Sequence, residues 1–219
     1  MAKNQPEGYL ALPAAGSGPG VLVLHAWWGL NATFKDFCER LAGEGFVAFA
    51  PDLFHGQIAT TIAEAERLSG EADAEAERVR GDIHQSIAYL RGLEAVTGQA
   101  VGIVGFSFGA YYALGASVDR PEDVGAVVLF YGSGQMDYTP ARAAYLAHFA
   151  ENDEWEPAEA VAQLAESLRA ADRPATIHSY PGTSHWFFEA DRPDAFNEQA
   201  AALAWERTVS FLKEKLAKP

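Results

Sequence analysis

The sequence predicts an α/β protein with a mostly parallel central sheet and helices on both faces. Short, continuous apolar runs of strand length alternate along the chain with longer segments of helical periodicity. Strands that are covered on both faces have uninterrupted apolar sequences, and strands that alternate with helices form right-handed crossovers within a parallel sheet. No internal repeat or long low-complexity linker divides the 219 residues. We therefore expect one domain that spans residues 1–219.

The expected elements follow this alternation from end to end. An edge strand is predicted at 9–13, because Pro13 cannot donate a hydrogen bond to a neighbouring strand. The buried strands are predicted at 21–25, 46–50, 99–106, 125–131, 143–149 and 175–180. The helices are predicted at 31–44, 58–94, 108–118, 157–171 and 194–216, with Asn31 as an N-cap and with breaks in the second helix near Gly70 and Gly81. The acidic, alanine-rich stretch 62–80 is expected to be a solvated helix face or, at most, part of a mobile cover.

Composition and charge exclude several classes of function. The formal net charge is −14, which disfavours nucleic acids and anionic membranes as partners. A single cysteine, Cys38, excludes an internal disulfide and any zinc site built from several cysteines, and it fits a reducing compartment. No apolar run approaches the roughly 20 residues that span a bilayer, and the first residues lack the apolar core of a signal peptide. We expect a cytoplasmic protein with no membrane contact.

A five-residue segment at a strand-to-helix junction carries the strongest functional signal. Gly105–Gly109 matches the pattern G-x-S-x-G and lies between an apolar strand and a helical segment. A sharp turn there lifts the serine out of the top of the sheet, and glycines flank it because strand and helix backbones approach closely. Ser107 is therefore the candidate nucleophile. The alternative is a glycine-rich turn that carries an ordinary surface serine.

A nucleophilic serine requires a base, which the order of residues places downstream. A serine hydroxyl is a poor nucleophile at neutral pH unless a histidine accepts its proton and an acid orients that histidine. Of the three downstream histidines, His148 and His178 fall inside expected strands, whereas His185 lies in a loop after the last one. Ligand chemistry gathers at the carboxyl ends of parallel strands, so His185 is the candidate base. The alternative is an ordinary surface-loop histidine.

The orienting acid should follow an earlier strand end. Asp153 comes directly after the strand predicted to end near Phe149, and it is our preferred candidate. Glu151 and Glu154 are neighbours that could take its place, and Asp137 is a more distant alternative. A solvated acidic loop is the non-functional interpretation in so acidic a chain.

The remaining site residues follow from the same geometry. The oxyanion hole needs two backbone N–H groups, which we assign to Phe108, the residue after the nucleophile, and to Trp27 in the loop after the first parallel strand. Aromatic residues crowd the same loops, and part of them should line an apolar substrate pocket. The candidates are Trp28, Phe54, Tyr131, Trp155 and Trp186.

Taken together, these segments resemble the dienelactone hydrolase family of the α/β-hydrolase superfamily. The resemblance runs nearly end to end and rests on the segments 25–31, 45–48, 51–54, 102–109, 151–153 and 180–187. It implies an α/β-hydrolase fold and hydrolysis of esters or lactones by a Ser or Cys nucleophile with Asp and His, without a metal or organic cofactor. Carried over by position, Ser107, Asp153 and His185 fill those roles.

The chain departs from the family's type enzyme at three positions. Ser107 stands where the nucleophile is usually Cys, and Ala26 replaces a Glu that helps to manage the thiol. These two changes are consistent with each other, because a carboxylate that helps to manage a thiol is not needed when the nucleophile is a serine. Glu189 lies where an Arg shortly after the histidine would hold a substrate carboxylate, and a Glu there would repel an anionic substrate.

The sequence therefore predicts a serine hydrolase of neutral, somewhat apolar esters or lactones that acts through an acyl-enzyme. Its expected partner is a small-molecule ester or lactone. One alternative is a non-catalytic ligand-binding protein on the same fold, because fold alone does not determine function. Another is a hydrolase of thioesters or peptides.

Overall fold

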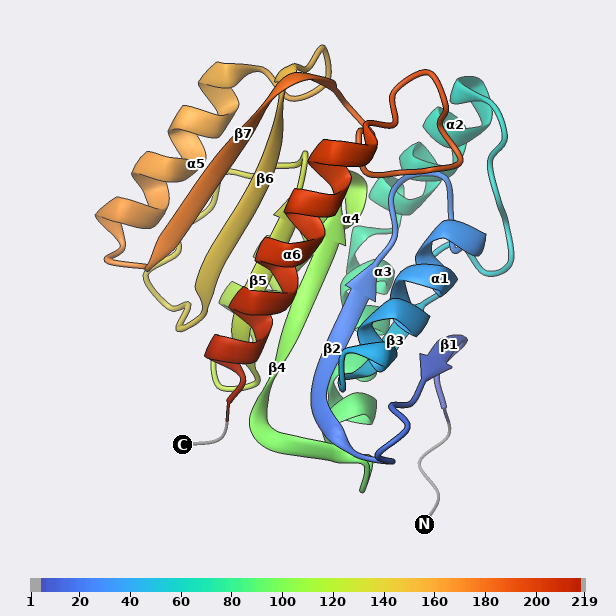
Figure 1. The fold of residues 1–219 in the computed structure, drawn as a ribbon, viewed down its shortest axis with the longest axis vertical. Coiled ribbons are helices and arrows are strands. Elements are labelled where there is room, and N and C mark those ends of the chain that lie inside the picture. Colours follow the sequence, from blue (N-terminus) through green and yellow to red (C-terminus); the bar gives the residue numbers. More distant parts are fainter. Residues whose placement is uncertain (1–4, 218–219) are drawn as a thin grey trace.

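The computed structural model describes residues 5–217, and a seven-stranded sheet lies at its centre (Figure 1). The strand order is β1-β3-β2-β4-β5-β6-β7; β1 pairs antiparallel with β3, and every other pair is parallel. The strands are β1 (Gly8–Ala11), β2 (Gly18–Leu24), β3 (Val47–Pro51), β4 (Val96–Phe106), β5 (Val124–Phe130), β6 (Ala144–Asn152) and β7 (Ala175–Ser184). The expected mostly parallel sheet and the expected edge strand are confirmed, and the pairing with β3 shows that the edge strand is antiparallel.

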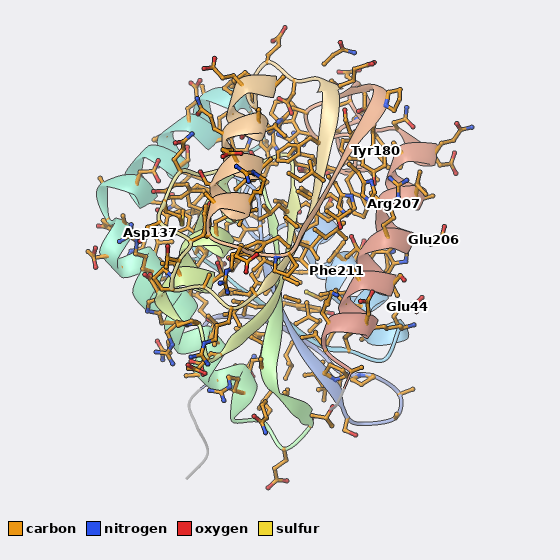
Figure 2. All side chains as sticks on the ribbon, turned by 90° about the vertical axis from the view of Figure 1, so that its left-hand side faces the viewer. Glu44, Asp137, Tyr180, Glu206, Arg207 and Phe211 are labelled. Carbon is orange, nitrogen blue, oxygen red and sulfur yellow. The ribbon has the colours of Figure 1, made fainter. Side chains whose placement is uncertain are left out.

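Helices cover both faces of the sheet. They are α1 (Ala32–Gly43), α2 (Ile62–Ala74), α3 (Ala76–Arg91), α4 (Phe108–Asp119), α5 (Ala158–Ala170) and α6 (Glu198–Lys215). In Figure 1, α1 and α6 lie in front of the sheet, and α3 and α4 lie behind it. Figure 2, turned by 90°, places α6 on one side of the sheet and the blue-green helices α2 and α3 on the other. This layering buries β2 to β5 on both faces, which explains their continuous apolar sequences.

The second helical segment breaks at a different place from the one predicted. The chain is interrupted at Glu75, whereas Gly70 and Gly81 lie inside α2 and α3, so the prediction of breaks at these glycines is wrong. A glycine costs a helix about 1 kcal/mol, which packing of buried positions such as Leu68 and Val79 outweighs. The interruption lets α3 pack against β2, β3 and β4 while α2 extends beyond the sheet.

Side-chain caps mark the starts of α2 and α6. α2 begins at Ile62, not at Ile58, because Thr61 and Glu64 form a capping box. α6 begins at Glu198, after Asn197 has accepted a hydrogen bond from the Ala200 N–H at 3.0 Å. Asn31 occupies the N-cap position of α1, but its side chain donates to Asp191 Oδ2 at 3.1 Å instead of capping the helix.

Two strands are longer at their carboxyl ends than predicted. β6 continues to Asn152 and β7 to Ser184, so Asp153 and His185 directly follow the ends of neighbouring strands. The loop expected between Tyr180 and His185 is therefore largely strand. Within residues 5–217, no helix combines the length and the apolar character that crossing a membrane requires.

Candidate active site

Ser107 lies in a strained turn between β4 and α4. Its backbone has φ 47° and ψ −110°, a conformation that L-residues rarely adopt outside functional sites. A Cβ on Gly105 would lie 2.5 Å from the Gly109 carbonyl oxygen, and one on Gly109 would lie 2.3 Å from the Leu24 carbonyl oxygen. Glycine is therefore required on both sides of the turn, for the close-approach reason inferred from the sequence.

The structure brings Ser107, His185 and Asp153 into one hydrogen-bonded line. Ser107 Oγ lies 2.9 Å from His185 Nε2. On the other side of the ring, His185 Nδ1 lies 2.8 and 2.9 Å from the two carboxylate oxygens of Asp153. The Nδ1–H therefore donates to Asp153, which leaves Nε2 free to accept the Ser107 proton. The His185 and Asp153 side chains are only 6% and 3% exposed, so water competes little for this line.

Asp153 is held in place by the backbone that follows it. The N–H groups of Trp155 and Glu156 both donate to Asp153 Oδ1 at 2.9 Å. The other acids that the sequence offered for the orienting role have other partners. Glu151 accepts a hydrogen bond from the Gly182 N–H at 2.8 Å, and Asp137 accepts one from the Thr139 N–H at 2.9 Å. Glu154 lines a neighbouring cavity instead of contacting the imidazole.

The other histidines of the sheet have structural partners. His148 is fully buried, accepts from Tyr180 O–H at 2.8 Å and donates to Thr208 Oγ1 at 3.0 Å, and burial holds its pKa well below the usual value. Arg207 Nη1 completes this chain by donating to the Tyr180 oxygen at 3.1 Å, and Figure 2 shows the two side chains together beside α6. His25 is buried too; its Nδ1–H donates to the Ala26 carbonyl oxygen at 2.7 Å.

Two cavities meet at the imidazole. A smaller one of about 240 Å³ contains Ser107, and a larger one of about 630 Å³ lies beside it. His185 and Trp155 line both. Ser69 and Asp73 of α2 line the smaller cavity, so part of the stretch 62–80 contributes to the wall of the space next to Ser107.

The structure divides the five aromatic pocket candidates into two groups. Trp28, Trp155 and Trp186 line the larger cavity. Phe54 and Tyr131 line neither cavity next to Ser107: Phe54 is 4% exposed and packs against His25, and Tyr131 is fully buried. Both therefore lie in the packing beneath the site, because a loop sequence does not indicate which way an aromatic ring points.

Trp27 and Phe108, the two predicted oxyanion donors, line the smaller cavity together with Ser107. Between residues 5 and 217, no group accepts a hydrogen bond from either of their backbone N–H groups. Two such donors beside a serine can bind the charge that develops on a carbonyl oxygen.

A buried carboxylic acid beneath the imidazole was not foreseen from the sequence. Glu189 is fully buried and accepts a hydrogen bond from Tyr131 O–H at 2.7 Å, and burial raises the pKa of Glu189 to about 8. The Tyr131 ring lies 4.8 Å from the His185 ring, so this pair forms the floor of the site. Glu189 lines neither cavity and its raised pKa favours the neutral acid, so the structure does not support the expectation that it would repel an anionic substrate.

Replacement of Glu189 by Gln should remove a pH dependence of stability. The folded chain keeps the Glu189 proton up to about pH 8, whereas the unfolded chain loses it near pH 4.5, so this group makes folding less favourable as the pH rises between these values. Relative to the native protein, Glu189→Gln should gain stability from pH 5 to pH 8, by at most about 5 kcal/mol. Urea unfolding at several pH values measures the difference. The exposed Glu206→Gln variant is the control. If the difference in unfolding free energy between Glu189→Gln and the native protein does not change with pH, the raised pKa of Glu189 is wrong.

The fold and this site define the class of the protein: it is an α/β hydrolase. The family model of the dienelactone hydrolase family matches residues 7–216, and the chain belongs to that family. It is 33% identical to "Putative carboxymethylenebutenolidase" of Aquifex aeolicus over 217 residues, which cover 96% of this chain and 94% of that protein. It is 32% identical to "Protein usf" of Aquifex pyrophilus, with the same coverage of both chains.

A solved structure has the same fold. The chain superposes with a TM-score of 0.83 on a dienelactone hydrolase-like promiscuous phosphotriesterase from metagenomic libraries, over 94% of this chain and 89% of that one. The sequence identity is 21%, so this similarity concerns the fold. The family membership establishes the chain as a carboxylic ester hydrolase, as the sequence resemblance implied.

Proposed function

We propose that the protein is a serine hydrolase that cleaves carboxylic esters or lactones through an acyl-enzyme formed on Ser107. The 2.9 Å hydrogen bond between Ser107 Oγ and His185 Nε2 carries this proposal. It joins a serine with a strained backbone to a base whose other ring nitrogen is hydrogen-bonded to the Asp153 carboxylate. The family supplies the reaction class, and these residues supply the chemistry.

Acylation follows from the hydrogen-bonded line. His185 Nε2 accepts the proton of Ser107 Oγ as that oxygen attacks the carbonyl carbon, and Asp153 stabilises the imidazolium that forms. The backbone N–H groups of Phe108 and Trp27 bind the oxyanion. His185 then gives its proton to the leaving oxygen, and the carbon–oxygen bond of the ester breaks.

Deacylation repeats these steps with water. His185 removes a proton from a water molecule, whose oxygen attacks the acyl carbon, and the proton returns to Ser107 Oγ as the acid departs. Every step uses protein groups and water. The single buried cysteine fits a reducing compartment, so we also propose that this one-domain protein works in the cytoplasm.

Labelling with a fluorophosphonate probe tests the proposal against a non-catalytic binding protein. Only an activated serine attacks phosphorus at a useful rate, so the protein should be labelled stoichiometrically at Ser107, and Ser107→Ala should not be labelled. A protein that remains unlabelled while folded would be a binding protein. A labelled protein that cleaves thioesters or peptides but no oxygen ester would keep the triad and change the substrate class.

A further inference from the structure

Three tryptophans form part of the wall of the larger cavity. Trp28 and Trp186 have ring centroids 5.4 Å apart, and Trp186 and Trp155 have centroids 6.1 Å apart. Trp155 is 47% exposed, so part of its ring surface is open to a ligand. The indole ring is the side chain whose face attracts cations most strongly.

Acidic groups outnumber basic ones around this cavity. Its wall contains Glu154, Asp191 and Asp194 against one cationic side chain, Arg192. The smaller cavity adds Asp73 and Glu156 and no basic side chain other than His185. Because a cleft with low-dielectric walls concentrates the field of its charges, this excess favours a positively charged ligand over a neutral or negative one.

The chain already places one of its own cations in this environment. The Arg192 guanidinium carbon lies 3.7 Å from the centroid of the Trp28 ring, and its nearest carboxylate oxygen, on Asp191, is 3.4 Å from Nη2. Aromatic and carboxylate groups thus already hold one cation in this wall. Trp155 and Asp194 add the same two kinds of group to the lining of the cavity.

The larger cavity reaches the imidazole that a leaving group must approach. In the proposed reaction, His185 gives its proton to the leaving oxygen, so the alcohol part of the ester must approach His185. His185 lines the larger cavity as well as the smaller one that holds Ser107. The alcohol part can therefore extend past His185 into the tryptophan-lined cavity.

We propose that the larger cavity is a cation-binding leaving-group site, and that the enzyme prefers esters whose alcohol carries a quaternary or protonated ammonium group. This inference rests on the proposed function for its reaction, but it concerns a recognition surface that can be tested by binding alone. The ammonium group lies against Trp155 and Trp186, and Glu154 and Asp194 balance its charge.

Three acetate esters of similar length test the preference. The alcohols are choline, its uncharged isostere 3,3-dimethylbutanol, and 4-hydroxybutanoate, which carries a carboxylate. Contact with an aromatic wall and a carboxylate should raise kcat/KM for the choline ester about tenfold over the isostere, and the anionic ester should be the slowest. Equal values for choline and isostere, with hydrolysis that depends on Ser107, overturn the preference and leave the hydrolase intact.

Variants of the wall should change the ratio of choline ester to isostere in opposite directions. Trp155→Leu and Asp194→Asn should each lower the ratio about threefold, because each removes one kind of cation contact. Arg192→Gln should raise it, since it removes a competing positive charge. Glu206→Gln is the matched control for Asp194→Asn: it removes the same charge from the exposed outer side of α6, where Figure 2 shows it, and the ratio should stay the same.

The clearest alternative to a cation site is that Arg192 binds an anionic substrate. If Arg192 instead binds a carboxylate, the anionic ester will be the best of the three substrates and Arg192→Gln will abolish that preference, which overturns the proposal. Titration of folded Ser107→Ala with choline, followed by tryptophan fluorescence, is independent of turnover. Saturable binding in the millimolar range that weakens in Ser107→Ala/Asp194→Asn supports the cation site; absence of binding excludes it, whatever the activity.

Discussion

Replacement of Ser107 by alanine should lower kcat for ester hydrolysis by on the order of 10⁴-fold or more. The Ser107 hydroxyl oxygen is the atom that lies 2.9 Å from His185 Nε2. Ser69 also lines the smaller cavity, but no hydrogen bond joins it to His185; its hydroxyl donates to the Glu66 carbonyl oxygen at 3.2 Å. The residual rate should come from the oxyanion donors and from substrate binding.

Hydrolysis of p-nitrophenyl acetate measures this loss. Ser210→Ala, on the exposed surface of α6, is the matched control and should keep full activity. Thermal unfolding must show that Ser107→Ala is folded, which we expect because alanine has no larger side chain to fit into the turn. Full esterase activity in a folded Ser107→Ala protein would remove the basis of the mechanism.

The architecture could be predicted because burial of the strands, which stabilises this fold, requires apolar residues at consecutive positions of the sequence. Strands buried on both faces require continuous apolar runs, and β2 and β5 have them at the expected places. The break in the second helical segment could not be predicted from glycines, since it depends on where α3 meets the sheet. The extensions of β6 and β7 depend on pairing between the two strands, in which Asn152 lies opposite Ser184.

Part of the candidate site could also be predicted from the sequence, and part of it could not. Ser107 stands in a motif that could be recognised: Gly105 is required by its close approach to the Gly109 backbone within the motif, although Gly109 is required by the distant Leu24 carbonyl oxygen. The sequence around His185 follows a strand that could also be recognised. The burial of Glu189 could not be anticipated, because it requires the end of β5 to bring Tyr131 under the segment that follows β7. The same applies to Phe54 and Tyr131, whose rings are buried in the packing.

Asp153→Asn should lower kcat by about 10³- to 10⁴-fold while the protein keeps its fold. The amide oxygen of Asn can still accept from the N–H groups of Trp155 and Glu156, so the turn after β6 should persist. The amide N–H₂ would then face His185 Nδ1 and donate to it. That contact places the imidazole proton on Nε2, so this nitrogen can no longer accept the proton of Ser107. The substitution also removes the carboxylate that is hydrogen-bonded to the ring and would stabilise an imidazolium.

Two acidic residues that compete with Asp153 in the sequence are the controls. Glu151→Gln keeps an oxygen that can accept from the Gly182 N–H, and Asp137→Asn keeps one for the Thr139 N–H, so each should change kcat less than about threefold. The same p-nitrophenyl acetate assay compares all three variants. A large loss in Glu151→Gln with near-normal activity in Asp153→Asn would move the orienting role to the other carboxylate. A loss confined to Asp153→Asn would instead tie catalysis to the carboxylate of Asp153, whose two oxygens both lie within 3 Å of His185 Nδ1.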